Sequence, residues 1–246
     1  MTTTYVLLFI ITVTFGFIQS ALGFGFSTLS MIFLPMLFPF KDAVNLNIYI
    51  VILNNLAMVA KYIKYVEWKK VIPAVIPYII VNLFLPMVTL EMDAQLLKFL
   101  LGILFMFLAL WSWFFANKVK LEGSVPVGVA MGSITGVVNS FFGIAGPTAA
   151  LYMLPASKNQ ESYVGNIQFF FTSGTLVNIM VRLAKGAFKS TYVAPLCIGW
   201  VGITIGMIMA SRLVIGHIKD DVFKKIVYSF VGLNGLWIVI SHFIGY

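Results

Sequence analysis

The chain has 246 residues, of which 61% are hydrophobic and only 10% are charged. A soluble domain carries roughly 25% charged residues, so the composition excludes an ordinary soluble protein and is typical of a membrane protein. The net charge of +8 does not indicate nucleic-acid binding, because the Lys and Arg residues lie in short loops between apolar runs, as the positive-inside rule describes.

Long apolar runs fill most of the sequence. A helix needs roughly 20 residues to span the hydrocarbon core, and most of the charge-free runs have that length. They are residues 1–40, 43–60, 71–90, 99–117, 123–157, 162–181, 190–211 and 226–246. These runs predict an all-α polytopic protein, multi-pass in the cell membrane of a bacterium or archaeon, whose first segment is retained and not removed as a signal peptide.

The first half begins with a run that is too long for one span. As one straight helix, residues 4–39 would extend ~54 Å. The glycines of Gly23-Phe24-Gly25 divide the run into Thr4–Leu22 and Phe26–Phe38, which we predict to form a helical hairpin. Three predicted transmembrane helices follow: Ala43–Ala60, Val71–Leu90 and Phe99–Asn117.

The second half repeats this plan. Ser124–Pro155 is again a long run broken by glycines, and we predict that Pro147-Thr148 begins its returning helix. Three predicted transmembrane helices follow this run: Ser162–Val181, Thr191–Ser211 and Ile226–Ile244. We therefore predict two homologous repeats, residues 1–122 and 123–246, within one integral membrane domain. Inverted and parallel halves both remain open, although the distribution of Lys and Arg favours the inverted arrangement.

The two broken runs share a motif at a constant offset of 120 residues. In each copy an amide and a hydroxyl residue precede the turn glycine, and a proline follows. The matched residues are Gly16, Gln19, Ser20, Gly23 and Pro35 in the first copy, and Gly136, Asn139, Ser140, Gly143 and Pro155 in the second. Glycines in membrane helices often serve close packing only, but this paired occurrence favours a functional site.

The sequence contains no common catalytic or metal-binding motif. Its two histidines, His217 and His242, lie in a loop and near the end of the chain, and every Asp and Glu lies in or beside a loop. An intramembrane hydrolase or a carboxylate-driven proton pump is therefore disfavoured. We predict no catalytic residue, no metal site and no cofactor.

An anion site suits the polar residues near the glycine breaks. Helix N-termini in broken-helix transporters direct free N–H groups and positive dipole ends at anions near the membrane midplane. Hydroxyl and amide side chains nearby, including those of the polar spans, add neutral donors. The predicted substrate-binding residues are Gln19, Ser20, Gly23, Gly25, Ser27, Thr28, Asn54, Asn55, Asn139, Ser140, Gly143, Gly146, Pro147, Thr148 and Asn178.

Four cations lie at the ends of the two polar spans. Lys61, Lys64, Arg182 and Lys185 are interpreted as interfacial residues whose charged groups extend to the membrane surface. A funnel that attracts anions is the alternative interpretation.

The glycine segments from Gly16 to Pro35 and from Gly136 to Pro155, with the two-half layout, resemble the sulfite exporter TauE/SafE family of membrane permeases. The resemblance covers essentially the whole chain. It implies transport of sulfur-containing anions such as sulfite, sulfoacetate or other organosulfonates.

We therefore expect an exporter of small sulfur-containing anions that works by alternating access. A channel-like pore for small anions is the first alternative. A membrane protein that transports nothing, such as an intramembrane enzyme or an assembly factor, is the second. The expected partners are a small anionic substrate and the lipid bilayer, without nucleic acid, and a homodimer is compatible with the sequence.

Overall fold

The computed structural model describes residues 2–114 and 124–213, and all regular structure in that part of the chain is helical. Apolar side chains dominate each helix, and glycines, charged loops or, between Leu37 and Phe40, a Phe-Pro pair separate them. The helices are α1 (Thr2–Leu22), α2 (Phe26–Leu37), α3 (Phe40–Tyr62), α4 (Trp68–Glu91), α5 (Ala94–Phe114), α6 (Val125–Phe142), α7 (Gly146–Ala156), α8 (Gln160–Ala184) and α9 (Val193–Leu213). Short 3₁₀ helices, Ile63–Tyr65 and Ser190–Tyr192, precede α4 and α9.

Six helical segments of the described residues are long and apolar enough to cross a membrane. They are Thr2–Leu22, Phe40–Tyr65, Trp68–Glu91, Val125–Phe142, Gln160–Ala184 and Ser190–Arg212. The helix α2 and the apolar part of α5, Ala94–Leu110, are shorter. The predicted all-α, multi-pass membrane protein is thus confirmed. The last predicted span, Ile226–Ile244, lies outside the described residues.

The chain packs as two compact units that do not coincide with the predicted repeats. One unit comprises Met1–Glu91 and Leu121–Val214, and the other comprises Met92–Lys120 and Ile215–Tyr246. Every described helix except α5 therefore belongs to the first unit. The division into repeats at residue 122 stays a prediction.

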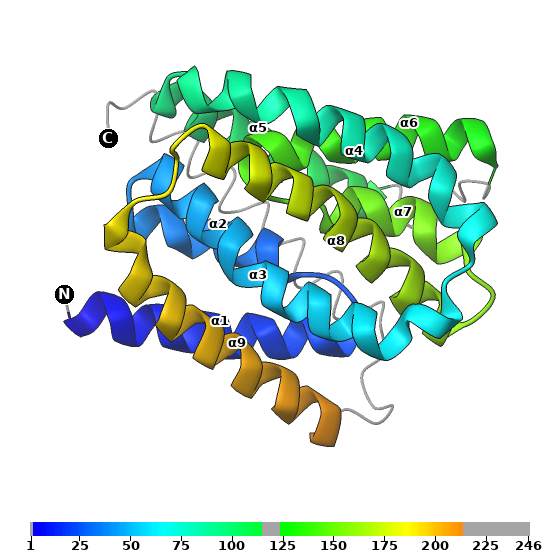
Figure 1. Cartoon of the computed structure of the whole chain (residues 1–246), viewed down its shortest axis with the longest axis horizontal. Coiled ribbons are helices and arrows are strands. Elements are labelled where there is room, and N and C mark those ends of the chain that lie inside the picture. Colours follow the sequence, from blue (N-terminus) through cyan, green and yellow to red (C-terminus); the bar gives the residue numbers. More distant parts are fainter. Residues whose placement is uncertain (1, 115–123, 214–246) are drawn as a thin grey trace. The chain divides into compact units, whose positions relative to one another are not determined.

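The helices of the first unit run between two ends, which we name the Asp42 end and the Glu67 end. At the Asp42 end, Lys189 Nζ lies 2.6 Å from Asp42 Oδ1. At the Glu67 end, the backbone N–H of Lys158 donates to Glu67 Oε1 at 3.0 Å. The helix α3 runs from the first end to the second, and α4 returns (Figure 1).

Two close helix pairs set the direction of the hairpins. The helix α1 runs parallel to α9, with Gly16 against the backbone of Ile203, and α6 runs parallel to α4, with Gly132 against the carbonyl of Ala74. Small residues permit such close approach in membrane helices. In both broken runs the second helix turns back: α2 returns toward the Asp42 end, and α7 returns toward the Glu67 end (Figure 1).

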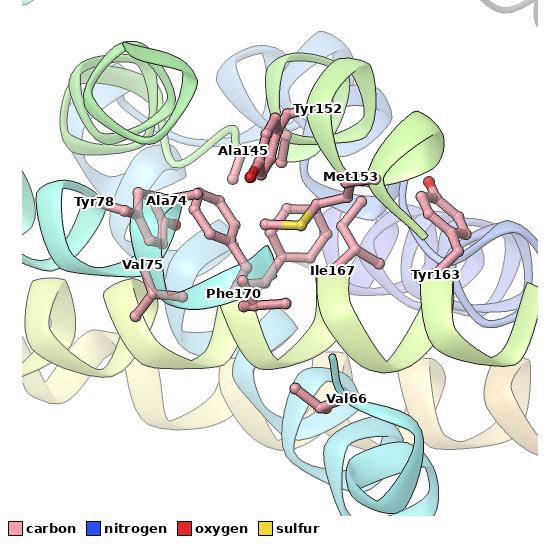
Figure 2. Close-up of a cluster of buried hydrophobic side chains, with 14 of the residues drawn as sticks. Val66, Ala74, Val75, Tyr78, Ala145, Tyr152, Met153, Tyr163, Ile167 and Phe170 are labelled. Carbon is pink, nitrogen blue, oxygen red and sulfur yellow. The ribbon is translucent and has the colours of Figure 1, made fainter. Parts of the chain in front are cut away.

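An apolar cluster joins α4, α7 and α8. The rings of Tyr78 and Phe170 stack with their centroids 4.1 Å apart, and Tyr152, Met153 and Ile167 complete its centre (Figure 2). The cluster continues to Ala145, at the start of α7. It therefore fixes the second hairpin turn against α8.

Candidate functional site

Glycine makes both hairpin turns. Gly25 has a φ of 126° and Gly143 has a φ of 68°, backbone conformations that residues with a Cβ rarely adopt. Gly143 ends α6 with a left-handed cap, and Gly25 directly precedes α2. The second helix of the first hairpin begins at Phe26, as predicted, and that of the second hairpin begins at Gly146, one residue before the predicted Pro147.

The N-termini of α2 and α7 face the same space. The helical hydrogen-bond ladders begin with Leu29 N–H donating to Gly25 O and Ala149 N–H donating to Ala145 O. The first-turn N–H groups of Ser27, Thr28 and Thr148 precede these bonds and lie at the positive ends of the helix dipoles. A methyl group on Gly146 would lie 3.6 Å from Thr28 Oγ1, so the two helix starts are in contact distance of each other.

A small cavity lies between these helix starts. Its volume is about 10 Å³, which is the space that one water molecule needs. The lining residues are Gln19, Gly25, Ser27, Thr28, Val51, Asn55, Asn139, Ala145, Gly146, Phe171 and Thr175. Ala145 and Phe171 also belong to the apolar cluster, so one wall of the cavity is apolar and the rest is rich in amides and hydroxyls.

The hydroxyl of Thr28 is the group in this cavity that most directly indicates a position for a ligand. The side chain is only 3% exposed, and among the described residues its Oγ1 has no hydrogen-bond partner. A buried hydroxyl without a partner costs about 1–3 kcal/mol. Because Thr28 lines the cavity, a ligand there is positioned to supply the missing hydrogen bond.

The two matched amides make different contacts. Gln19 Oε1 accepts from the N–H of Phe26 at 3.2 Å, and Gln19 Nε2 donates to Asn55 Oδ1 at 2.7 Å. Asn139 Nδ2 instead donates to Asn82 Oδ1 at 2.8 Å. The repeated motif therefore places both amides at one cavity, but with different hydrogen-bond partners.

A reciprocal pair of amides holds the two hairpin turns. Asn47 of α3 donates to the carbonyl of Gly143 at 3.2 Å, and Gln168 of α8 donates to the carbonyl of Gly23 at 2.8 Å. Each turn is thus bound by a helix of the other half of the sequence. These bonds satisfy carbonyls that the broken helices leave free.

The structure gathers about half of the predicted binding residues around the cavity. Those that line it are Gln19, Gly25, Ser27, Thr28, Asn55, Asn139 and Gly146. The others lie next to it in sequence or pair elsewhere: Gly23, Gly143, Pro147 and Thr148 in the turns and first helical turn, Ser20 with Asn54, and Ser140 and Asn178 around Asn82. Substrate binding by any of them stays a prediction. The sequence did not single out Val51, Phe171 and Thr175, whose residue types are common in membrane cores.

The interfacial interpretation of Arg182 is wrong. Its side chain is only 2% exposed and lies among helices, not at the surface. Nε donates to Asn178 Oδ1 at 2.7 Å, Nη1 donates to Asn45 Oδ1 at 2.7 Å, and Nη2 donates to the carbonyl of Ser140 at 2.8 Å. These neutral acceptors, one of them at the C-terminal end of α6, replace the water that the guanidinium would meet at the surface.

Arg182 connects the cavity to the Asp42 end through hydrogen bonds. On one side, Asn178 donates to Asn82 Oδ1, which also accepts from Asn139 of the cavity. On the other side, Asn45 donates to Tyr192 Oη at 3.2 Å, and Tyr192 donates to Asp42 Oδ1 at 2.6 Å. A polar network with one buried cation therefore runs beside the cavity.

The donor set of the cavity suits an anion better than a metal ion. In the described residues, no group of three or more His, Cys, Asp or Glu residues is close enough to hold a metal. The cavity instead offers hydroxyls, amides and helix N-termini. Neutral donors of this kind bind an oxyanion without an opposing fixed charge.

Comparison with known proteins indicates the family of this chain. A family model described as sulfite exporter TauE/SafE matches residues 8–238. No curated protein and no solved structure matches the chain. The family match covers both hairpins and most of the sequence, which confirms the resemblance seen in the glycine segments. The chain therefore belongs to the sulfite exporter TauE/SafE family, a family of membrane transporters.

Proposed function

We propose that the protein exports small sulfur-containing oxyanions across the cell membrane and that the cavity between α2 and α7 is the substrate site. Family membership supports the class of substrate. The observation that carries the site is the unpartnered Thr28 hydroxyl, which lines the cavity between two helix N-termini. A sulfonate or sulfite oxygen there accepts hydrogen bonds from the hydroxyl and from first-turn N–H groups.

Alternating access between two inverted repeats is the proposed mechanism. The packing pattern supports it: α1 pairs with α9 as α6 pairs with α4, and α3 packs against α8. When α1, α2, α3 and α4 are matched in order with α6, α7, α8 and α9, the α1–α9 pair corresponds to the α6–α4 pair. The α3–α8 pair then corresponds to itself. The hairpins α1–α2 and α6–α7 also turn back toward opposite ends. Such symmetry lets a site at the centre open to either side by equivalent movements.

A cavity with room for one water molecule is too small for a sulfur oxyanion, so the hairpins must move to admit substrate. An anion that leaves a negative cell interior gains about 2.3 kcal/mol per charge per 100 mV. Export therefore requires no second ion, in keeping with spans that bury no carboxylate in the described residues.

Flux from proteoliposomes tests this function. With sulfite loaded inside and the potential clamped, we expect efflux that increases with interior-negative potential and saturates with concentration. Strict dependence on a proton or sodium gradient, without voltage dependence, would contradict potential-driven export. Currents of channel magnitude in a planar bilayer would favour the anion pore.

Thr28→Val should separate binding from stability. Valine keeps the shape but removes the unpartnered hydroxyl, so we expect unchanged or slightly higher thermal stability and about tenfold weaker sulfite binding. Thr172 provides the matched control, because its hydroxyl is also buried and unpartnered but does not line the cavity. Thr172→Val should have a similar effect on thermal stability but leave sulfite binding unchanged. Equal sulfite affinity in the two variants, measured by calorimetry, would remove Thr28 from the site.

A further inference from the structure

Two hydrogen bonds, one to Arg182 and one to the carbonyl of Tyr78, determine how the side-chain amides of Asn178 and Asn82 are oriented. The guanidinium of Arg182 only donates hydrogen bonds, so Asn178 must present its Oδ1 to Nε. The Asn178 Nδ2 group is then the one that meets Asn82 Oδ1, at 2.9 Å. From the other direction, the carbonyl of Tyr78 only accepts, and Asn82 Nδ2 donates to it at 2.8 Å. Both contacts require the same orientation of Asn82, with Nδ2 toward the Tyr78 carbonyl and Oδ1 toward Asn178.

This orientation determines what Asn139 offers to the cavity. Asn82 presents an oxygen, so Asn139 must meet it with its amide nitrogen, at 2.8 Å. The carbonyl oxygen of Asn139 is the remaining polar atom of a side chain that lines the cavity. It is a hydrogen-bond acceptor, and Arg182 holds it in that role from a distance as a positioning residue.

The opposite wall has the reverse polarity. The N–H of Phe26 only donates, which assigns the oxygen of Gln19 to it and the amide nitrogen of Gln19 to Asn55 Oδ1. Asn55 therefore keeps its Nδ2 donor for the cavity that it lines. The cavity thus combines several donors, from Asn55, Thr28 and the helix starts, with one fixed amide acceptor, Asn139.

We infer that the substrate is a small oxyanion that itself carries one hydrogen-bond donor, an O–H or N–H group that donates to Asn139 Oδ1. This inference rests on the proposed function and narrows its substrate class. An anion made only of acceptor oxygens would place one of them against the carbonyl oxygen of Asn139, which is repulsive. A singly protonated sulfite or a hydroxyalkyl sulfonate has oxygens that accept hydrogen bonds from the donors of the cavity and an O–H group that donates to Asn139.

A pair of organic sulfonates tests the inference. Isethionate and propane-1-sulfonate have the same number of heavy atoms and the same charge, but only isethionate has a hydroxyl donor. We expect purified wild-type protein to bind isethionate about tenfold more tightly, by calorimetry in detergent. In Asn139→Leu the ratio should fall to about one. Asn82 Oδ1 retains Asn178 as its partner, so this variant should fold, and Asn139→Ala provides a second one.

Asn55→Leu is the matched control on the opposite wall. It removes a donor, so both sulfonates should bind more weakly while their ratio stays near the wild-type value. Equal affinities in the wild type would overturn the inference but leave anion transport intact. A tenfold ratio that persists in both Asn139 variants would overturn the role of Asn139. Absence of both sulfonate binding and sulfite efflux would count against the proposed function itself.

Discussion

Replacement of Arg182 by Met should destabilise the protein by about 3 kcal/mol, the size expected when one partner of a buried charged interaction is removed. The change leaves three buried acceptors without their donor: Asn178 Oδ1, Asn45 Oδ1 and the carbonyl of Ser140. Loss of the buried charge offsets part of this cost, since the guanidinium no longer has to be kept from water. The midpoint of thermal unfolding in detergent measures the effect.

Two further variants distinguish the role of Arg182 from a general need for positive charge. Arg182→Lys keeps the charge but loses the planar fork of donors, so its stability should lie between those of wild type and Arg182→Met. Lys185→Met removes an exposed cation one turn away and should change little. If Arg182→Met unfolds at the wild-type temperature, the buried network makes no net contribution to stability.

Gly146→Leu should abolish anion binding, with an affinity loss of at least about 100-fold. Any Cβ at this position would lie 3.1 Å from Phe24 Cδ2 and 3.6 Å from Thr28 Oγ1, so the leucine side chain must occupy the cavity. The change lies at the first position of α7, where a leucine is compatible with helical geometry. Calorimetry should therefore show that Gly146→Leu has lost sulfite binding. The yield of membrane-inserted protein should match that of the wild type.

Ala60→Leu is a suitable comparison for Gly146→Leu. It places the same leucine side chain at an exposed position of α3, away from the cavity lining. This variant should bind sulfite as the wild type does. Normal sulfite binding by Gly146→Leu would show that the anion occupies another part of the protein.

Much of the fold could be predicted from the sequence, because membrane spans have a strong signature of length and composition. The runs 4–39 and 124–155 are too long for one span each, and their glycines indicate where they turn, so the starts of α2 and α7 were predicted within one residue. The constant offset between Gln19 and Asn139 likewise indicated that both amides share a site, and both line the cavity.

The buried network could not be predicted in the same way. Arg182 lies at the end of a span, a position where most cations reach the surface, and only packing by other helices buries it. Asn82 was not identified from the sequence, because it lies in an apolar, proline-rich span, but it accepts hydrogen bonds from three side chains. One sequence feature is consistent with this network: residues 43–60 and 162–181 carry many amides but no Asp or Glu, because the acidic residues of α3 and α8, Asp42 and Glu161, lie in the first turns of these helices.

The hydrogen bonds of the hairpin turns also constrain the order in which the helices can pack as the chain is inserted into the membrane. The carbonyl of Gly23 is bound by Gln168, which leaves the ribosome long after the turn itself has been synthesised. The first hairpin must therefore wait in the bilayer, with its turn incomplete, until α8 has been inserted. A truncated product that ends before α8 should for the same reason expose a polar backbone to lipid, which makes it a natural substrate for membrane quality-control proteases.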